Sequence, residues 1–163
     1  MTTRCGFIPA CLALIGACGV GAQTPASHTA DGYLLVWSDE FNRDGRPDPN
    51  NWVYERGFVR NEELQWYQPE NATCKDGLLV IEARRERKPN PDYDLASSSW
   101  RRSRPFIEYT STCIKTIGRH NWTYGRFEMR GRSDTRPGRW PAFWTLGSAR
   151  GWPGCGEIDI MEY

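Results

Sequence analysis

The chain has 163 residues, which is enough for one domain with a sizeable core. Its formal net charge is +1; of its 21 basic residues only Arg4 precedes Asp31, so the other 20 balance the 20 acidic residues. This balance argues against nucleic acid or an acidic membrane surface as the main partner, and weakly favours a neutral one. The eight Trp residues provide flat apolar surfaces that stack on a ligand or fill a core.

The first 22 residues have the features of an export segment. Arg4 precedes an apolar run over residues 5–22, which is short for a membrane span. Two ways of processing remain open. One is cleavage after Ala22, which leaves a secreted or periplasmic protein. The other is a lipobox at residues 15–18, Ile-Gly-Ala-Cys, which leaves Cys18 as a lipidated residue at the outer membrane or cell surface. We favour the lipobox, because Cys18 falls at the end of the short apolar run.

The chain divides into three parts on this basis. A signal segment covers residues 1–17, or 1–22 if cleavage follows Ala22, and a flexible polar linker extends to residue 32. The folded domain covers residues 33–163. Its three cysteines are Cys74, Cys113 and Cys155, whose spacing does not fit a zinc site. An odd number leaves one thiol free or one partner missing.

The folded domain has β patterns throughout. Runs of β-branched and aromatic residues bounded by turn residues predict strands. They cover residues 33–41, 51–55, 63–68, 78–86, 107–118, 124–132 and 140–147, with a turn at Lys75-Asp76-Gly77. The polar stretch 85–105 is predicted to be a long loop, which is unusual unless functional or mobile. Many short strands with frequent turns predict an antiparallel sandwich or jelly roll.

The last predicted strand, "GEIDIMEY", carries Glu157, Asp159 and Glu162. Side chains on a strand alternate faces, so the first two share a face and Glu162 points the other way. A one-residue bulge near Ile160-Met161 would return Glu162 to the face of the other two, and bulges cluster beside active sites.

Three carboxylates on one face would repel, so at least one is expected to hold a proton near neutral pH. With the bulge, the Cα atoms of Glu157 and Glu162 are roughly 13 Å apart, and leaning side chains could close this to about 5–5.5 Å, the separation of a retaining glycosidase pair. A solvated acidic face and a metal site are the alternatives. The apolar flanks and the Trp-rich run before the acids favour a substrate cleft.

Four motifs follow one another along the chain: "WSDEFN", "RNEELQWYQPENA", "YGRFEMRGRSDTRPGRWPAFWTLG" and "GEIDIMEY". Together they resemble glycoside hydrolase family 16, over roughly residues 33–163. The resemblance implies a jelly roll of two curved antiparallel sheets with a substrate cleft across the concave face. It also implies that Glu157 is the nucleophile and Glu162 the general acid/base, with Asp159 between them tuning their charge.

The resemblance implies further substrate contacts. Trp140 and Trp144, four apart and so expected on one strand face, are similar to Trp residues that stack on sugars. The other implied contacts come from Trp152, Asn61, Glu62 and Arg126. Glu62 stands where the family often has Asn, and Cys113 where it often has Arg, so those two contacts differ from the usual pattern.

The resemblance implies a monomeric endo-β-glycosidase that hydrolyses β-1,3- or mixed β-1,3/1,4-glucan with retention and without a cofactor for the chemistry. Related branches that act on agar or carrageenan share the acids, and a non-catalytic, lectin-like sandwich is the other alternative. Some members hold a structural calcium, for which Glu40 and the Gly77 carbonyl lie in matching segments, but the metal is left undecided. Because a family jelly roll needs roughly a hundred further residues, we expect this chain to be an N-terminal part, truncated after the catalytic strand, inactive and marginally stable alone.

Overall fold

A computed structural model describes residues 31–163. The expected signal segment with Cys18, and most of the linker, lie outside the described residues. The chain divides into two units, Met1–Ser38 and Asp39–Tyr163, and all the helices and strands described below belong to the second. Within residues 31–163, no helix has the length and apolar character that crossing a membrane requires.

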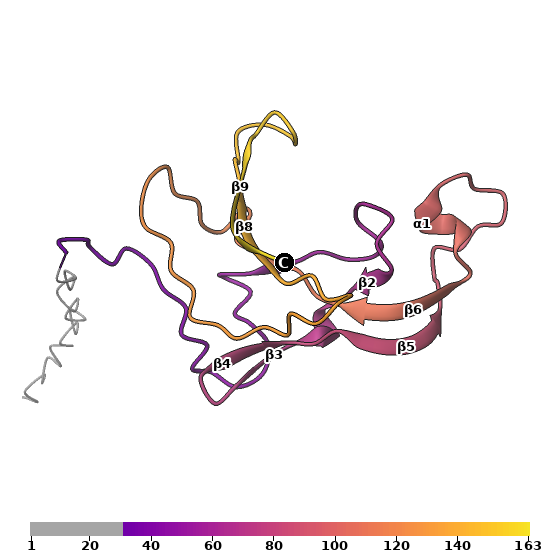
Figure 1. Ribbon diagram of the computed structural model, residues 1–163, viewed down its shortest axis with the longest axis horizontal. Coiled ribbons are helices and arrows are strands. Elements are labelled where there is room, and N and C mark those ends of the chain that lie inside the picture. The colour runs from indigo at the N-terminus through magenta and orange to yellow at the C-terminus, as the bar shows by residue number, and fades with distance from the viewer. Residues whose placement is uncertain (1–30) are drawn as a thin grey trace, which may run out of the picture. The chain divides into compact units, whose positions relative to one another are not determined.

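The second unit is mostly β (Figure 1). Its two short helical turns are η1 (Pro69–Asn71) and α1 (Trp100–Ser103). The strands are β1 (Val53–Tyr54), β2 (Gln65–Tyr67), β3 (Ala72–Lys75), β4 (Leu78–Ile81), β5 (Arg84–Pro89), β6 (Phe106–Ser111), β7 (Ile114–Lys115), β8 (Ala142–Leu146) and β9 (Glu157–Glu162).

The strands pair in four groups: β1 with β7, β3 with β4, β8 with β9, and a three-stranded sheet in the order β2-β6-β5. Every pair is antiparallel except β2 and β6, which run parallel. The prediction of wholly antiparallel sheets is wrong at this pair. Parallel neighbours need a long connection, and β3, β4 and β5 lie between β2 and β6 in the chain.

The turn predicted at Lys75-Asp76-Gly77 is confirmed. It joins β3 to β4, and Lys75 pairs with Leu78 across it. Asp76 and Gly77 both have positive φ, 51° and 72°. That conformation matches the twist of a two-residue hairpin, which Asp-Gly adopts readily.

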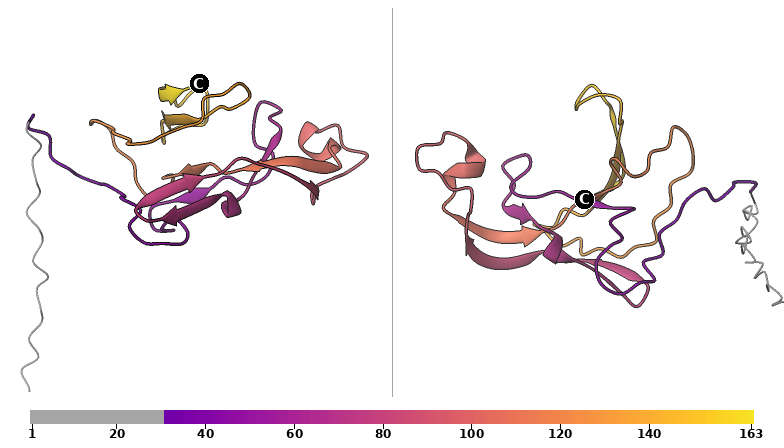
Figure 2. Two further views of the ribbon diagram at one scale, coloured as in Figure 1. Left: turned by 60° about the horizontal axis from the view of Figure 1, so that its bottom comes forward. Right: turned by 180° about the vertical axis from the view of Figure 1, so that it is seen from behind.

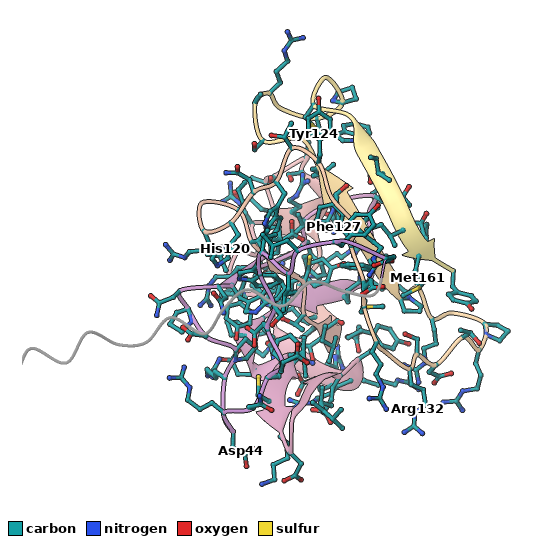
Figure 3. The ribbon with its side chains drawn as sticks, turned by 90° about the vertical axis from the view of Figure 1, so that its left-hand side faces the viewer. Asp44, His120, Tyr124, Phe127, Arg132 and Met161 are labelled. Carbon is teal, nitrogen blue, oxygen red and sulfur yellow. The ribbon has the colours of Figure 1, made fainter. Side chains whose placement is uncertain are left out.

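Two predicted strands are absent from the described part of the chain, at residues 33–41 and 124–132. In the second segment, Phe127 and Met129 remain 41% and 50% exposed. Alternating side chains form a strand only where a neighbouring strand supplies backbone partners, and residues 31–163 place none beside this segment. Figure 3 labels Tyr124, Phe127 and Arg132 along it.

The region from residue 78 to 105 also differs from the prediction. The expected strand 78–86 is broken into β4 and β5, because β4 pairs with β3 while β5 pairs with β6. The expected loop 85–105 contains most of β5 and all of α1.

The buried apolar residues come from β2, β3, β6 and the loop before β2. They are Phe58, Tyr67, Ala72, Cys74 and Ile107. Asn71, 1% exposed, donates from Nδ2 to the Glu82 carbonyl (2.9 Å) and to Thr110 Oγ1 (3.0 Å). This buried polar contact connects η1 to β6.

Figure 2 shows the β8–β9 hairpin, in yellow and orange, set apart from the layer of strands β3 to β6.

Candidate active site

The pairing of β8 with β9 contains the predicted bulge. Trp144 pairs with Asp159 and the preceding residue, Phe143, pairs with Met161, so Ile160 is an extra residue on β9. The expectation of a bulge near Ile160-Met161 is confirmed. Met161, labelled at the end of β9 in Figure 3, is half-buried.

The bulge brings the three acids to one face. Directly opposed residues of an antiparallel pair share a face, and residues two apart on β8 share one too. Glu157 lies opposite Leu146, Asp159 opposite Trp144, and Glu162 opposite Ala142. The three carboxylates therefore share the face of Trp144, as the alternation plus one bulge predicted. Ile158 and Thr145 lie on the other face.

Two indoles hold the outer acids of this face. Trp152 donates from Nε1 to Glu157 Oε2 at 2.7 Å, and Trp140 donates from Nε1 to Glu162 Oε1 at 2.8 Å. A hydrogen bond of this kind orients the carboxyl group that accepts it. Both indoles remain largely exposed, at 69% and 68%, so their ring faces are open to solvent.

The expectation that Trp140 and Trp144 share one strand face is not met, because β8 begins at Ala142, after Pro141. Proline removes a ladder donor, so it tends to precede a strand interior. Trp140 reaches the acids from the segment before β8, whereas Trp144 lies within the strand opposite Asp159.

The middle acid carries the expected effect of crowding. Loss of hydration raises the pKa of Asp159, and the neighbouring charges of Glu162 and Glu157 raise it further. This direction agrees with repulsion among the three acids, while the expectation that one of them holds a proton near neutral pH stays a prediction. The group is exposed, so water screens much of the repulsion.

A cation that sequence reasoning missed lies against Trp144. The Arg60 guanidinium is 5.6 Å from the centroid of the Trp144 ring and 5.6 Å from that of Tyr67. Arg60 also forms an ion pair with Glu55, whose side chain is 8% exposed. In the sequence, nothing distinguishes Arg60 from a solvated charge, because its contact with Trp144 joins residues far apart in the chain.

Glu55 has a second cation, since Lys115 Nζ lies 3.0 Å from its Oε1. Burial opposes ionisation of Glu55, but hydrogen bonds from Arg60 and Lys115 outweigh burial and hold its pKa below the ordinary value. The Cys113 thiol lies in the same cluster. Burial and the charge of Glu55 raise the pKa of Cys113 to about 12, which keeps the thiol protonated and unreactive.

Asn61 and Glu62, predicted to bind sugar, lie in a loop that Gly57 and Tyr67 close with a pair of backbone hydrogen bonds of 3.0 Å each. Both are exposed, and the loop also carries Arg60, which reaches Trp144. Arg126, the remaining predicted contact, lies in the segment before β8 and pairs with Glu128, Nε to Oε1 3.3 Å.

The described part of the chain contains no group of three or more His, Cys, Asp or Glu arranged to hold a metal ion. A structural calcium near Glu40 therefore stays undecided. Cys74, Cys113 and Cys155 are all free thiols in the described residues.

Comparison with known proteins identifies the family. The model of glycosyl hydrolases family 16 matches residues 61–163. A β-glucanase of Rhodothermus marinus is 43% identical over 161 residues, which cover 92% of this chain and 50% of the relative.

Solved structures agree. The laminarinase of Rhodothermus marinus superposes with a TM-score of 0.62 and 44% identity, covering 79% of this chain and 49% of that one. A structure from work on endo-acting O-glycanases of the human gut microbiota, which initiate mucin breakdown, superposes with a TM-score of 0.75 and 39% identity. It covers 85% of this chain and 51% of that one. The chain thus spans about half the length of these relatives, and the expected all-β jelly-roll class is confirmed. The chain belongs to glycosyl hydrolases family 16.

Proposed function

We propose that the protein is a retaining endo-β-glucanase that hydrolyses β-1,3- or mixed β-1,3/1,4-glucan. The observation that carries this proposal is the bulged strand β9, with three carboxylates on one face and an indole donor on each of the outer two. Family membership and the similarity to a β-glucanase support it.

The proposed reaction takes two steps. The Glu157 carboxylate attacks the anomeric carbon while Glu162 donates its proton to the departing glycosidic oxygen, so the C–O bond breaks and a glycosyl ester forms. Glu162, now ionised, takes a proton from water, whose oxygen attacks the same carbon and releases Glu157. Two inversions give net retention.

The neighbouring side chains have supporting roles in this proposal. Trp152 and Trp140 orient the two reacting carboxyl groups and offer exposed ring faces for sugar stacking. Asp159, which holds its proton more tightly than usual, moderates the repulsion between its neighbours. Asn61, Glu62 and Arg126 are proposed substrate contacts.

The test is hydrolysis by the complete gene product, followed by analysis of the anomeric configuration of the first product. We expect laminarin and lichenan to be cleaved with retention. E157Q and E162Q are expected to lower kcat by about a thousand-fold, because each removes a group that takes part in bond breaking. Full activity of either variant would refute the assignment, and binding without cleavage by the wild type would favour a lectin-like module.

A second candidate is a galactose-containing glycan, such as agar, carrageenan or a mucin O-glycan. The TM-score to the O-glycanase-related structure is 0.75 and that to the laminarinase is 0.62, and this difference supports the second candidate substrate. Agarose and mucin O-glycans therefore belong in the same assay, and cleavage of these alone would select this candidate.

We also propose that the protein is exported and tethered through lipidated Cys18. The apolar run and the Ile-Gly-Ala-Cys sequence at residues 15–18 support this. Metabolic labelling with a lipid precursor should mark the wild type and not C18A. An unlabelled wild type that is found in the medium or periplasm would favour cleavage after Ala22.

A further inference from the structure

The polar stretch between β5 and β6, residues 90–105, is an ordered excursion. Asn90 is 5% exposed and lies where this segment begins. It joins the beginning of the segment to its end, because its Nδ2 donates to the carbonyls of Arg101 (3.1 Å) and Arg104 (2.8 Å). The Asn90 N–H also donates to the Pro105 carbonyl at 3.0 Å. One buried amide thus fixes both ends of the segment that carries α1.

Two arginines of the excursion reach a second loop, residues 58–63. Arg101 donates from Nε to the Phe58 carbonyl at 2.9 Å, and its Nη2 donates to the Val59 carbonyl. Arg104 donates from Nη1 to the Glu63 carbonyl at 2.6 Å and from Nη2 to the Glu62 carbonyl at 2.7 Å. Four backbone carbonyls of the 58–63 loop therefore accept charge-assisted hydrogen bonds from two planar guanidinium groups. A lysine ammonium group cannot reproduce this geometry.

Aromatic packing reinforces the same contact. The rings of Phe58 and Trp100 lie 5.9 Å apart, centroid to centroid. The Arg104 guanidinium lies 5.0 Å from the Phe58 centroid, and that of Arg101 lies 4.6 Å from the Trp100 centroid. Planar guanidinium groups on aromatic faces lose less freedom than flexible ammonium groups would.

The 58–63 loop needs this support. Asn61 and Glu62 have φ of 53° and 52°, a left-handed conformation that costs free energy for residues other than glycine. Two such residues in succession persist only where their surroundings hold them. The loop also contacts the acid face, because Arg60 lies against Trp144, which stands opposite Asp159.

We propose that Arg101 and Arg104 are positioning residues, which hold the 58–63 loop so that Asn61 and Glu62 line a sugar subsite beside the acids. This deepens the proposed function and rests on it. The excursion acts through the loop, so it sets how tightly the sugar chain binds and leaves the bond-breaking step to β9.

The test compares the double variant R101Q/R104Q with R102Q in the complete gene product. Arg102 lies beside Arg101 on α1, but its guanidinium contacts Asp94 and the Asp92 carbonyl inside the excursion. R101Q/R104Q should raise KM about ten-fold and change kcat by less than about two-fold, since binding and not chemistry is affected. Backbone amides of residues 58–63 should exchange with solvent faster in the double variant, and R102Q should alter neither measurement.

The outcomes separate the two proposals. If the wild type cleaves no glucan or galactan, the proposed function fails, while amide exchange still tests the arginine contact. If the wild type is active and the double variant shows unchanged KM or unchanged exchange, the positioning role is wrong. If R101Q/R104Q does not fold, R104K replaces it, since lysine keeps the charge but offers one compact donor. R104K is expected to raise KM by about three-fold. An unchanged KM in R104K would also show that the positioning role is wrong.

Discussion

The indoles at the two ends of β9 are the side chains that most directly control the proposed catalytic pair. An indole N–H is only a donor, and a carboxyl group accepts it in either protonation state. Trp152 and Trp140 can therefore keep Glu157 and Glu162 oriented through both steps of a cycle in which Glu162 acts first as acid and then as base.

Replacing Trp152 with Phe removes the donor while keeping an apolar ring. W152F is expected to lower kcat/KM by about ten-fold, because Glu157 loses the bond that aims it at the anomeric carbon. Steady-state kinetics on laminarin measures this. W152H, which keeps a ring N–H, should recover part of the loss, and equal activity of W152F and wild type would show that the bond does not matter.

Glu55 is the residue whose charge should matter most for stability. Its pKa is below the ordinary value, so the ion pairs with Arg60 and Lys115 stabilise the fold above that ordinary value, 4.5, and this contribution is lost as the pH falls through the lowered pKa. E55Q leaves two partly exposed cations without a counter-charge, which should cost about 2 kcal/mol near neutral pH.

Urea unfolding of E55Q and wild type at neutral pH and at about pH 3 checks the sign. The difference in free energy of unfolding between wild type and E55Q should be largest at neutral pH and should shrink in acid. E108Q is the matched control, since Glu108 pairs with Arg87 in a mostly exposed position and should change little. A difference that is constant with pH would contradict the role of the charge.

At the scale of elements, the bulge in β9 determines which face each acid occupies. Side chains alternate with a period of two, so one extra residue reverses the face of everything after it. Ile160 is that residue, and Glu162 returns to the face of Asp159 because the ladder skips it.

Single deletions on either side of Asp159 should therefore have opposite results. Without Ile160 the strand becomes regular and Glu157, Asp159 and Glu162 still share a face, so activity is expected to stay within about a hundred-fold of wild type. Without Ile158, Glu157 moves to the face opposite Asp159 and Glu162, and activity should be lost. Kinetics on soluble glucan, with circular dichroism to confirm folding, compares the two, and equal losses would contradict this account of register.

At the scale of the whole molecule, the β8–β9 hairpin is a two-stranded sheet within the described residues. Ile158 is 68% exposed on the face opposite the acids. Isolated hairpins with apolar faces are marginal in water and invite further strands to pair with them.

The 163-residue chain is therefore expected to self-associate, and I158K should reduce the association because lysine on an open strand blocks pairing. Light scattering over a range of concentrations measures the effect. T145K, on the same face at a position that is less apolar, serves as a comparison and should act more weakly. A wild-type chain that stays monomeric at high concentration would refute the prediction.

Local patterns determined much of this protein in advance. The Asp76-Gly77 turn, the β class and the shared face of the three acids follow from the conformational preferences of a few neighbouring residues and from the period of a strand. The motifs around Glu157 and Glu162 also indicated the family, which the comparison confirmed.

Only the tertiary structure decided the contacts between residues far apart in the chain. The contact of Arg60 with Trp144, the hold of Arg101 and Arg104 on the 58–63 loop, and the parallel pairing of β2 with β6 all join segments that no local pattern connects. The same reason explains the failed strand at residues 124–132, whose alternation was correct for a strand. A strand or an ion pair exists only where a partner lies beside it, and the position of that partner is a property of the folded chain.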